Sequence, residues 1–169
     1  FQAIKHITTG DGGMLIIKNK DLIEKAERIR WFGIDRKAKQ AGIWENDITE
    51  IGYKYQMTDI AAAMGIASIK EFDEVSRLRK KLFKVYSDEL TGYDRVKIVG
   101  NDFEDREHAA WLFTIIVDDR FRLQEKLREN KIESNQVHFR NDRYSIFNDF
   151  TSGKAFPNMD KIEDKYLVL

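Results

Sequence analysis

The sequence predicts a mixed α/β chain in which an N-terminal α/β part is joined by a long helix to a small α+β domain. A short apolar run follows a glycine-rich turn near the N-terminus. An amphipathic helical pattern then extends over residues 69–90, and a strand–helix–strand order follows it. At 169 residues, the chain is long enough for one domain, or for part of a large domain plus a small one.

The first elements are predicted from the spacing of apolar residues. Met14–Ile17 is a continuous apolar run behind a glycine turn, which predicts a buried strand. Residues 21–30 carry apolar side chains at helical spacing and predict a helix. Residues 31–47 mix glycines, charges and aromatic side chains, and we expect an irregular loop there.

Two helical patterns occupy the middle of the chain. Thr58 is a favourable N-cap residue and predicts a helix that begins beside it. Residues 61–67 are small and apolar nearly all round, so we expect this helix to be deeply buried. From Ile69 the pattern becomes amphipathic, which is compatible with one long helix or with two helices that bend near residues 65–68.

The C-terminal half alternates short strands and helices, which is typical of a small α+β domain. We expect strands at Val96–Val99, Ala109–Val117 and Ser134–Phe139, helices at 120–130 and 144–150, and a final helix-to-strand segment at 159–169. We place the domain boundary in the amphipathic helix, which gives an N-terminal domain of residues 1–85 and a C-terminal domain of residues 86–169.

Composition excludes several classes of function. The 29 basic and 29 acidic side chains give no net charge, which argues against a dedicated nucleic-acid binder. The chain has no cysteine, and its three histidines are too widely spaced to suggest a metal site. Without a run of 18 apolar residues we expect no membrane span and a cytoplasmic protein. Both ends of the sequence are abrupt, so we expect the chain to be a piece of a longer protein.

Lys5 is the first candidate for chemistry. It lies between apolar residues and is followed by threonines and a glycine turn. A lysine amine becomes nucleophilic in a pocket that lowers its pKa, so this setting suits a Schiff-base lysine. It suits a phosphate-binding lysine equally well, and most lysines are simply exposed to solvent. The residues alone leave these three alternatives open.

Three segments together resemble one known family. Phe1–Gly13 has a phenylalanine, a lysine four residues later and a Gly-x-Gly-Gly turn. Ile51–Ala63 contains Gly-Tyr-Lys and an Asp-Ile-Ala-Ala-Ala run, and Val137–Phe139 reads Val-His-Phe. In order and interval these segments resemble the motifs of the DegT/StrS-type sugar aminotransferases, which use pyridoxal 5'-phosphate (PLP) and have fold type I.

The resemblance implies a fold, an activity and site residues. The chain would be the C-terminal part of the PLP-binding large domain plus a truncated small domain. It would transfer an amino group from glutamate to a nucleotide-linked keto-deoxysugar, as a homodimer. Lys5 would be the Schiff-base lysine and the proton carrier, Lys54 and Gln56 would reach the PLP phosphate of the neighbouring subunit, and His138 would face the substrate.

The resemblance also leaves alternatives. In fold type I, the partners of the PLP ring nitrogen and phosphate precede the lysine, whereas only four residues precede Lys5 here. We therefore expect this chain not to form a complete site by itself. A related sugar dehydratase would carry histidine in place of the lysine, which Lys5 argues against. A non-catalytic dimerisation module of the same fold is the remaining alternative.

Overall fold

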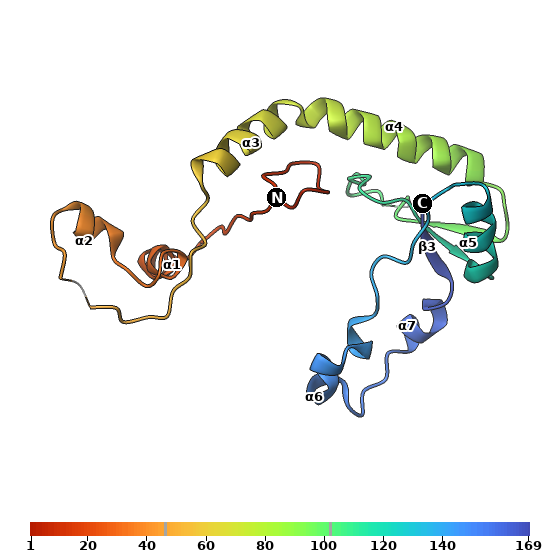
Figure 1. The fold of residues 1–169 in the computed structure, drawn as a ribbon. Helices are drawn as coiled ribbons and strands as arrows, with labels where there is room; N and C mark the ends of the chain where they lie inside the picture. Colours follow the sequence, from red (N-terminus) through yellow and green to blue (C-terminus); the bar gives the residue numbers. More distant parts are fainter. Residues whose placement is uncertain (46, 102) are drawn as a thin grey trace. The chain divides into compact units, whose positions relative to one another are not determined.

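The computed structural model describes residues 1–45, 47–101 and 103–169, and Figure 1 shows the order of its elements along the chain. The described chain divides into two compact units, Phe1–Phe72 and Asp73–Leu169. The division falls where one helix ends and the next begins. The predicted boundary at residue 85 lies farther along, inside the second of these helices.

The described residues of the N-terminal unit form a 3-10 turn, three helices and connecting loops. Their bounds are η1 Lys20–Leu22, α1 Ile23–Arg30, α2 Arg36–Gln40 and α3 Asp59–Lys70. Polar caps set two of the helix starts: the carboxylate of Asp35 accepts from the backbone N–H of Ala38, and the Thr58 hydroxyl accepts from that of Ala61. The predicted helix over residues 21–30 and the predicted cap at Thr58 are thus confirmed, and α2 adds a short helix to the expected loop.

Two predictions for this unit are wrong, for one physical reason. In the described part of the chain Met14–Ile17 belongs to no strand, and Met14 and Ile16 are 76% and 79% exposed. Helix α3 is not deeply buried either, since Gly65 is its buried residue and Ile60 is 78% exposed. An apolar run specifies a buried strand or helix only when other segments pair with it or cover it.

A close crossing of two glycines joins α1 to the segment that precedes α3. The backbone N–H of Tyr53 donates to the carbonyl oxygen of Ile29 at 2.7 Å, and that of Tyr55 donates to the carbonyl oxygen of Arg30 at 2.9 Å. Where the segments cross, a Cβ on Gly52 would lie 1.9 Å from the backbone nitrogen of Gly33. This approach requires glycine, because any side chain at Gly52 would overlap the backbone.

The C-terminal unit contains a long helix and a three-stranded antiparallel sheet. Helix α4 spans Phe72–Leu90, and the strands are β1 Val96–Val99, β2 Thr114–Val117 and β3 Tyr166–Val168. The strand order is β1-β2-β3, with Ile115 opposite Ile98 on one side and opposite Leu167 on the other. The central strand β2 therefore pairs on one edge with β1, which follows α4 in the chain, and on the other edge with β3 near the C-terminus.

The core of this unit lies on one side of the sheet. Leu167 is fully buried and Ile115 is 2% exposed. Apolar side chains from both helices beside the sheet pack against them, namely Phe83 and Leu90 from α4 and Leu123 and Leu127 from α5, which spans Arg120–Glu129. Removing this much apolar surface from water is the main stabilising term for a small α+β unit.

Short elements fill the segment between α5 and β3. They are η2 Asn141–Arg143, η3 Ser145–Phe147, α6 Asn148–Thr151 and α7 Pro157–Ile162. The predicted helix at 120–130, the first strand and the final helix-to-strand segment are confirmed. The expected strand at residues 109–117 is shorter, because only Thr114–Val117 pairs with neighbours. The expected strand at residues 134–139 is wrong, since its ladder is limited to one bridge between Asn135 and Val168.

The glycine crossing predicts a specific sensitivity of the N-terminal unit. Replacing Gly52 with alanine should push the two crossing segments apart and lower the free energy of unfolding by about 2–3 kcal/mol. Amide hydrogen exchange should then accelerate at Tyr53 and Tyr55, whose N–H groups bind α1. The matched control is Gly13→Ala, because a Cβ there meets no atom within 4 Å. Equal exchange rates in Gly52→Ala and the wild type would contradict the predicted clash.

Candidate active site

Lys5 lies on a tight turn at the start of the N-terminal unit. Its backbone N–H donates to the carbonyl oxygen of Gln2 at 3.0 Å, and the N–H of Thr9 donates to that of Phe1 at 3.0 Å. These two bonds fold residues 1–9 into a compact loop. The Lys5 side chain is half-buried in it, unlike the exposed residues 2–4.

Helix α3 holds this turn through two threonines. The Ser68 hydroxyl oxygen accepts a hydrogen bond of 3.0 Å from the backbone N–H of Thr8. Thr9 is 6% exposed, and its Cγ2 would lie 3.0 Å from a Cβ on Gly65. Gly65 therefore makes room for Thr9, and Ser68 fixes the backbone three residues after Lys5. Glycine is unfavourable inside a helix, and Gly65 is tolerated in α3 because it has this packing role.

The loop that follows the lysine turn is closed by two further local hydrogen bonds. The Thr8 hydroxyl oxygen accepts from the N–H of Gly10 at 3.0 Å, and the Thr9 hydroxyl donates to the carbonyl oxygen of Asp11 at 2.7 Å. Gly10 has a φ of +81°, a left-handed conformation that costs glycine little. The threonine pair thus stabilises both sides of the turn, which limits the movement of the Lys5 backbone.

Lys54 and Gln56 belong to the segment that crosses α1. Lys54 is exposed and forms a backbone bridge with Trp31. Gln56 is half-buried, and its Oε1 accepts a 2.6 Å hydrogen bond from Nη1 of Arg36. Both Arg36 and Gln56 line a hollow of about 330 Å³ beside α1 and α2. The structure therefore places Lys54 and Gln56 with the α1–α2 segment, and Lys5 on the turn that α3 holds.

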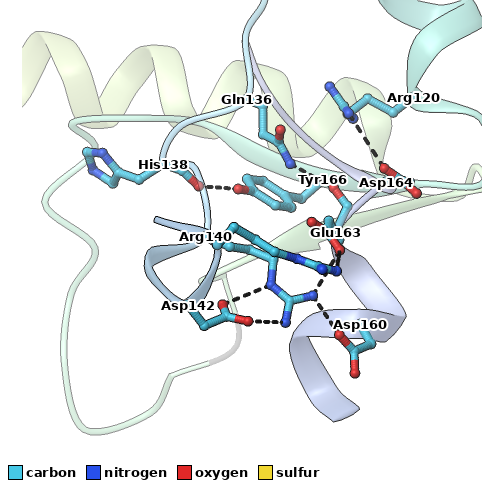
Figure 2. Close-up of polar contacts among 10 residues, drawn as sticks. Arg120, Gln136, His138, Arg140, Asp142, Asp160, Glu163, Asp164 and Tyr166 are labelled. Carbon is cyan, nitrogen blue, oxygen red and sulfur yellow. Dashed lines mark hydrogen bonds and ion pairs between the residues drawn. The ribbon is translucent and has the colours of Figure 1, made fainter. Parts of the chain in front are cut away.

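His138 belongs to the C-terminal unit. Its side chain is exposed, and its ring centroid lies 6.1 Å from that of Trp111. Its carbonyl oxygen accepts a hydrogen bond from the hydroxyl of Tyr166 in β3. In Figure 2 the imidazole points away from Tyr166 and from the charged residues beneath it, so the backbone of His138 is held while its ring remains accessible.

A buried arginine beside His138 was not predicted from the sequence. The side chain of Arg140 is 2% exposed, and all three of its guanidinium nitrogens donate to carboxylates. Nε and Nη2 bind Asp142 at 2.9 and 2.6 Å, and Nη1 binds Asp160 of α7 at 2.6 Å and Glu163 at 2.9 Å. Figure 2 shows this group, which we call the Arg140 cluster: Arg140, Asp142, Asp160 and Glu163.

Mutual charge stabilisation shifts the acidity of the Arg140 cluster. The hydrogen bonds that Arg140 donates to Asp142 and Asp160 raise the pKa of Arg140 above its ordinary value. The hydrogen bond from Arg140 lowers the pKa of Asp142, and the bond from Arg143 is the largest cause that lowers the pKa of Glu163. Arg140, Asp142 and Glu163 are therefore held in their charged forms at neutral pH.

Sequence reasoning had one available signal for this cluster. The run Arg-Asn-Asp-Arg at residues 140–143 places opposite charges two positions apart. Nothing in the sequence connects it to Asp160 or Glu163, which lie 20 and 23 residues farther along. That pairing depends on how β3 returns to β2.

The described residues contain no group of three or more histidine, aspartate or glutamate side chains that could hold a metal ion. None of the helices formed by these residues has the length and apolar character needed to cross a membrane.

Comparison with known proteins identifies the family. The family model described as the DegT/DnrJ/EryC1/StrS aminotransferase family matches residues 1–169. The chain therefore belongs to this family, which confirms the predicted resemblance and the partial fold type I assignment.

Individual relatives agree with the family match. The chain is 31% identical over 147 residues to the UDP-4-amino-4,6-dideoxy-N-acetyl-beta-L-altrosamine transaminase of Campylobacter jejuni, covering 83% of this chain and 37% of the relative. It is similar to the crystal structure of AtS13 from Actinomadura melliaura, with a TM-score of 0.88, 34% identity, and coverage of 100% of this chain and 44% of the other.

A second structure shows the same similarity. The sugar aminotransferase CalS13 from Micromonospora echinospora has a TM-score of 0.88 and 29% identity, with coverage of 99% of this chain and 44% of the other. The chain thus spans less than half the length of these relatives.

The anchoring of the lysine turn gives a testable prediction. Replacing Ser68 with alanine removes the acceptor of the part-buried Thr8 N–H, which should cost about 1 kcal/mol of stability. Amide exchange at Thr8 and at neighbouring turn residues should accelerate, while α4 amides stay unchanged. Ala67→Ser is the control, because it places a hydroxyl at an exposed position of the same helix. Unchanged exchange at Thr8 in the Ser68 variant would contradict this anchoring.

Proposed function

We propose that this chain is the C-terminal part of a PLP-dependent aminotransferase that converts a nucleotide-linked keto-deoxysugar into an aminosugar. The observation that carries the proposal is the family match over all 169 residues, which includes the lysine turn. The structural support is the fixed geometry of that turn, with Lys5 half-buried and its flanking backbone bound to α3.

The chemistry of the predicted site residues fits PLP. An aldehyde is bound covalently by a primary amine, which Lys5 supplies. A phosphate is bound by cationic and amide donors, which Lys54 and Gln56 supply. The bond from Arg36 to Oε1 of Gln56 orients the amide so that Nε2 is the end that donates to an anion. PLP, when bound, supplies the electron sink for breaking a bond at the amino-bearing carbon.

In this proposal Lys5 has two tasks. Its Nζ is the covalent attachment point of the cofactor. Once released from the cofactor, the same Nζ would act as the acid and base that moves a proton between the carbon that loses the amino group and the carbon that gains it. Proton transfer of this kind requires the amine within hydrogen-bond reach of both positions. The two threonine anchors support that requirement because they restrict the backbone on the C-terminal side of Lys5.

We further propose that the enzyme is a homodimer in which Lys54 and Gln56 bind the PLP phosphate of the neighbouring subunit. Lys54 and Gln56 are held by Trp31 and Arg36 of the α1–α2 segment, whereas Lys5 is held by α3. This separate attachment is compatible with two groups that serve different sites of a two-fold symmetric dimer.

The substrate class follows from the names of relatives. The Campylobacter jejuni relative is named for a UDP-linked sugar, and CalS13 is named a sugar aminotransferase. We propose that His138 contacts the nucleotide sugar from the C-terminal domain and that glutamate donates the amino group. The exposed imidazole of His138 supports a contact role, since a buried structural histidine would be covered.

A non-catalytic dimerisation module of the same fold is the second candidate. The observation in its favour is the exposed apolar surface of α3, on which Ile66 and Ile69 are 60% and 59% exposed. The two candidates differ in one measurable property, because the module needs no PLP.

Uptake of PLP tests the enzymatic proposal directly. The full-length gene product should show the visible absorption band of lysine-bound PLP, and borohydride should bleach it and fix the cofactor on the peptide that contains Lys5. Lys5→Ala should lack the band and lose about 10³-fold or more of the transaminase activity. Lys18→Ala, at an exposed position of the same unit, is the control and should keep both. A full-length protein that takes up no PLP but still dimerises would favour the second candidate.

Mixed dimers test the role of Lys54 and Gln56. Lys5→Ala and the double variant Lys54→Ala/Gln56→Ala should each be inactive as homodimers. If Lys54 and Gln56 act across the subunit interface, every mixed dimer contains one intact site, so random mixing should restore about a quarter of wild-type activity. Recovery no greater than the sum of the two unmixed variants would show that these residues act within their own subunit.

A further inference from the structure

We propose that Arg140 is a positioning residue for His138, acting through the backbone of residues 136–140. This inference rests on the proposed function, because it assigns His138 its substrate contact. It makes Arg140 a determinant of nucleotide-sugar binding that acts through His138 and does not itself touch the substrate.

The first argument is how the segment is attached. Nε2 of Gln136 donates to the carbonyl oxygen of Glu163 at 2.7 Å, and the Tyr166 hydroxyl donates to the carbonyl oxygen of His138. Arg140 then donates hydrogen bonds to the side chains of Asp160 and Glu163. Every second residue of this segment is therefore bound to α7 or to the chain between α7 and the first residue of β3, as Figure 2 shows for the labelled side chains.

The second argument is the direction of the imidazole. Because the carbonyl of His138 is held by Tyr166, rotation of this backbone is restricted. Figure 2 shows the imidazole pointing away from Tyr166 and from the Arg140 cluster, and His138 is exposed. The attachments on both sides of His138 thus decide which way its ring points, and a change in them alters the ring position without a change in its chemistry.

The third argument is the free-energy cost of burying the charged side chain of Arg140 in this cluster. Three carboxylates surround one buried guanidinium, and the exposed Arg143 adds a second bond to Glu163 at 2.9 Å. Burying an arginine side chain to 2% exposure requires compensation for its lost hydration, and a planar guanidinium provides it by binding all three carboxylates at once. A lysine at this position keeps the charge but cannot reproduce this geometry.

Two substitutions weaken these attachments without removing the core. Arg140→Lys retains the positive charge, and Tyr166→Phe removes only the hydroxyl that holds the His138 carbonyl. Matched controls are Arg128→Lys and Tyr93→Phe, which change the same chemistry at exposed positions. Circular dichroism and thermal unfolding select the variants that remain folded.

The activity experiment uses the full-length gene product. Arg140→Lys and Tyr166→Phe should each raise KM for the nucleotide ketosugar on the order of tenfold, while the half-reaction with the amino donor, followed by the cofactor absorption, stays unchanged. In a His138→Ala background the same substitutions should have no further effect on KM. Additive effects with His138→Ala, or an equal loss in the donor half-reaction, would overturn the proposal.

A second measurement separates this inference from the proposed function. The chain has three histidines, so their imidazole NMR signals can be assigned by single substitutions. Arg140→Lys and Tyr166→Phe should shift the signal of His138 and leave that of His6 unchanged. If these shifts occur in a protein without transaminase activity, positioning holds and the proposed function fails. If the His138 signal does not move, positioning by Arg140 is refuted even in an active enzyme.

Discussion

The pairing of β3 with β2 is the contact on which the C-terminal unit depends. Strand β3 has three residues, yet it buries Leu167 completely against the central strand. The same pairing returns the end of the chain to the sheet, which places Tyr166 beside the backbone of His138 and Glu163 beside Arg140. Loss of this short strand would therefore remove the hydrophobic core and the polar attachments of the candidate substrate residue together.

The N-terminal unit depends on close backbone approach more than on burial of side chains. Gly52 crosses Gly33 at a distance that excludes any side chain, and Gly65 accommodates Thr9 on α3. The first contact holds the segment that carries Lys54 and Gln56, and the second holds the turn that carries Lys5. Small residues thus position the predicted cofactor-binding groups, while many apolar side chains of this unit, such as Ile51 at 83%, remain exposed.

Candidate residues were predictable from the sequence where they lie in local motifs. Lys5, Lys54, Gln56 and His138 were all selected from short segments in which residue type and interval resemble the aminotransferase family, and the family match confirms that resemblance. Their roles remain proposals. Arg140 could not be selected in this way, because its partners are 20 and 23 residues away and no local pattern connects them.

The sequence by itself determined the helices that carry their own signals, such as the cap at Thr58 and the apolar spacing of α5, since caps and periodicity act within a few residues. It also determined the family. Only the tertiary structure decided whether an apolar run became a buried element. Met14–Ile17 was predicted to be a strand but belongs to no strand among the described residues, whereas Tyr166–Val168 pairs with β2. Strand formation depends on hydrogen bonds to a distant segment, and the sequence of one segment does not specify that segment's partner.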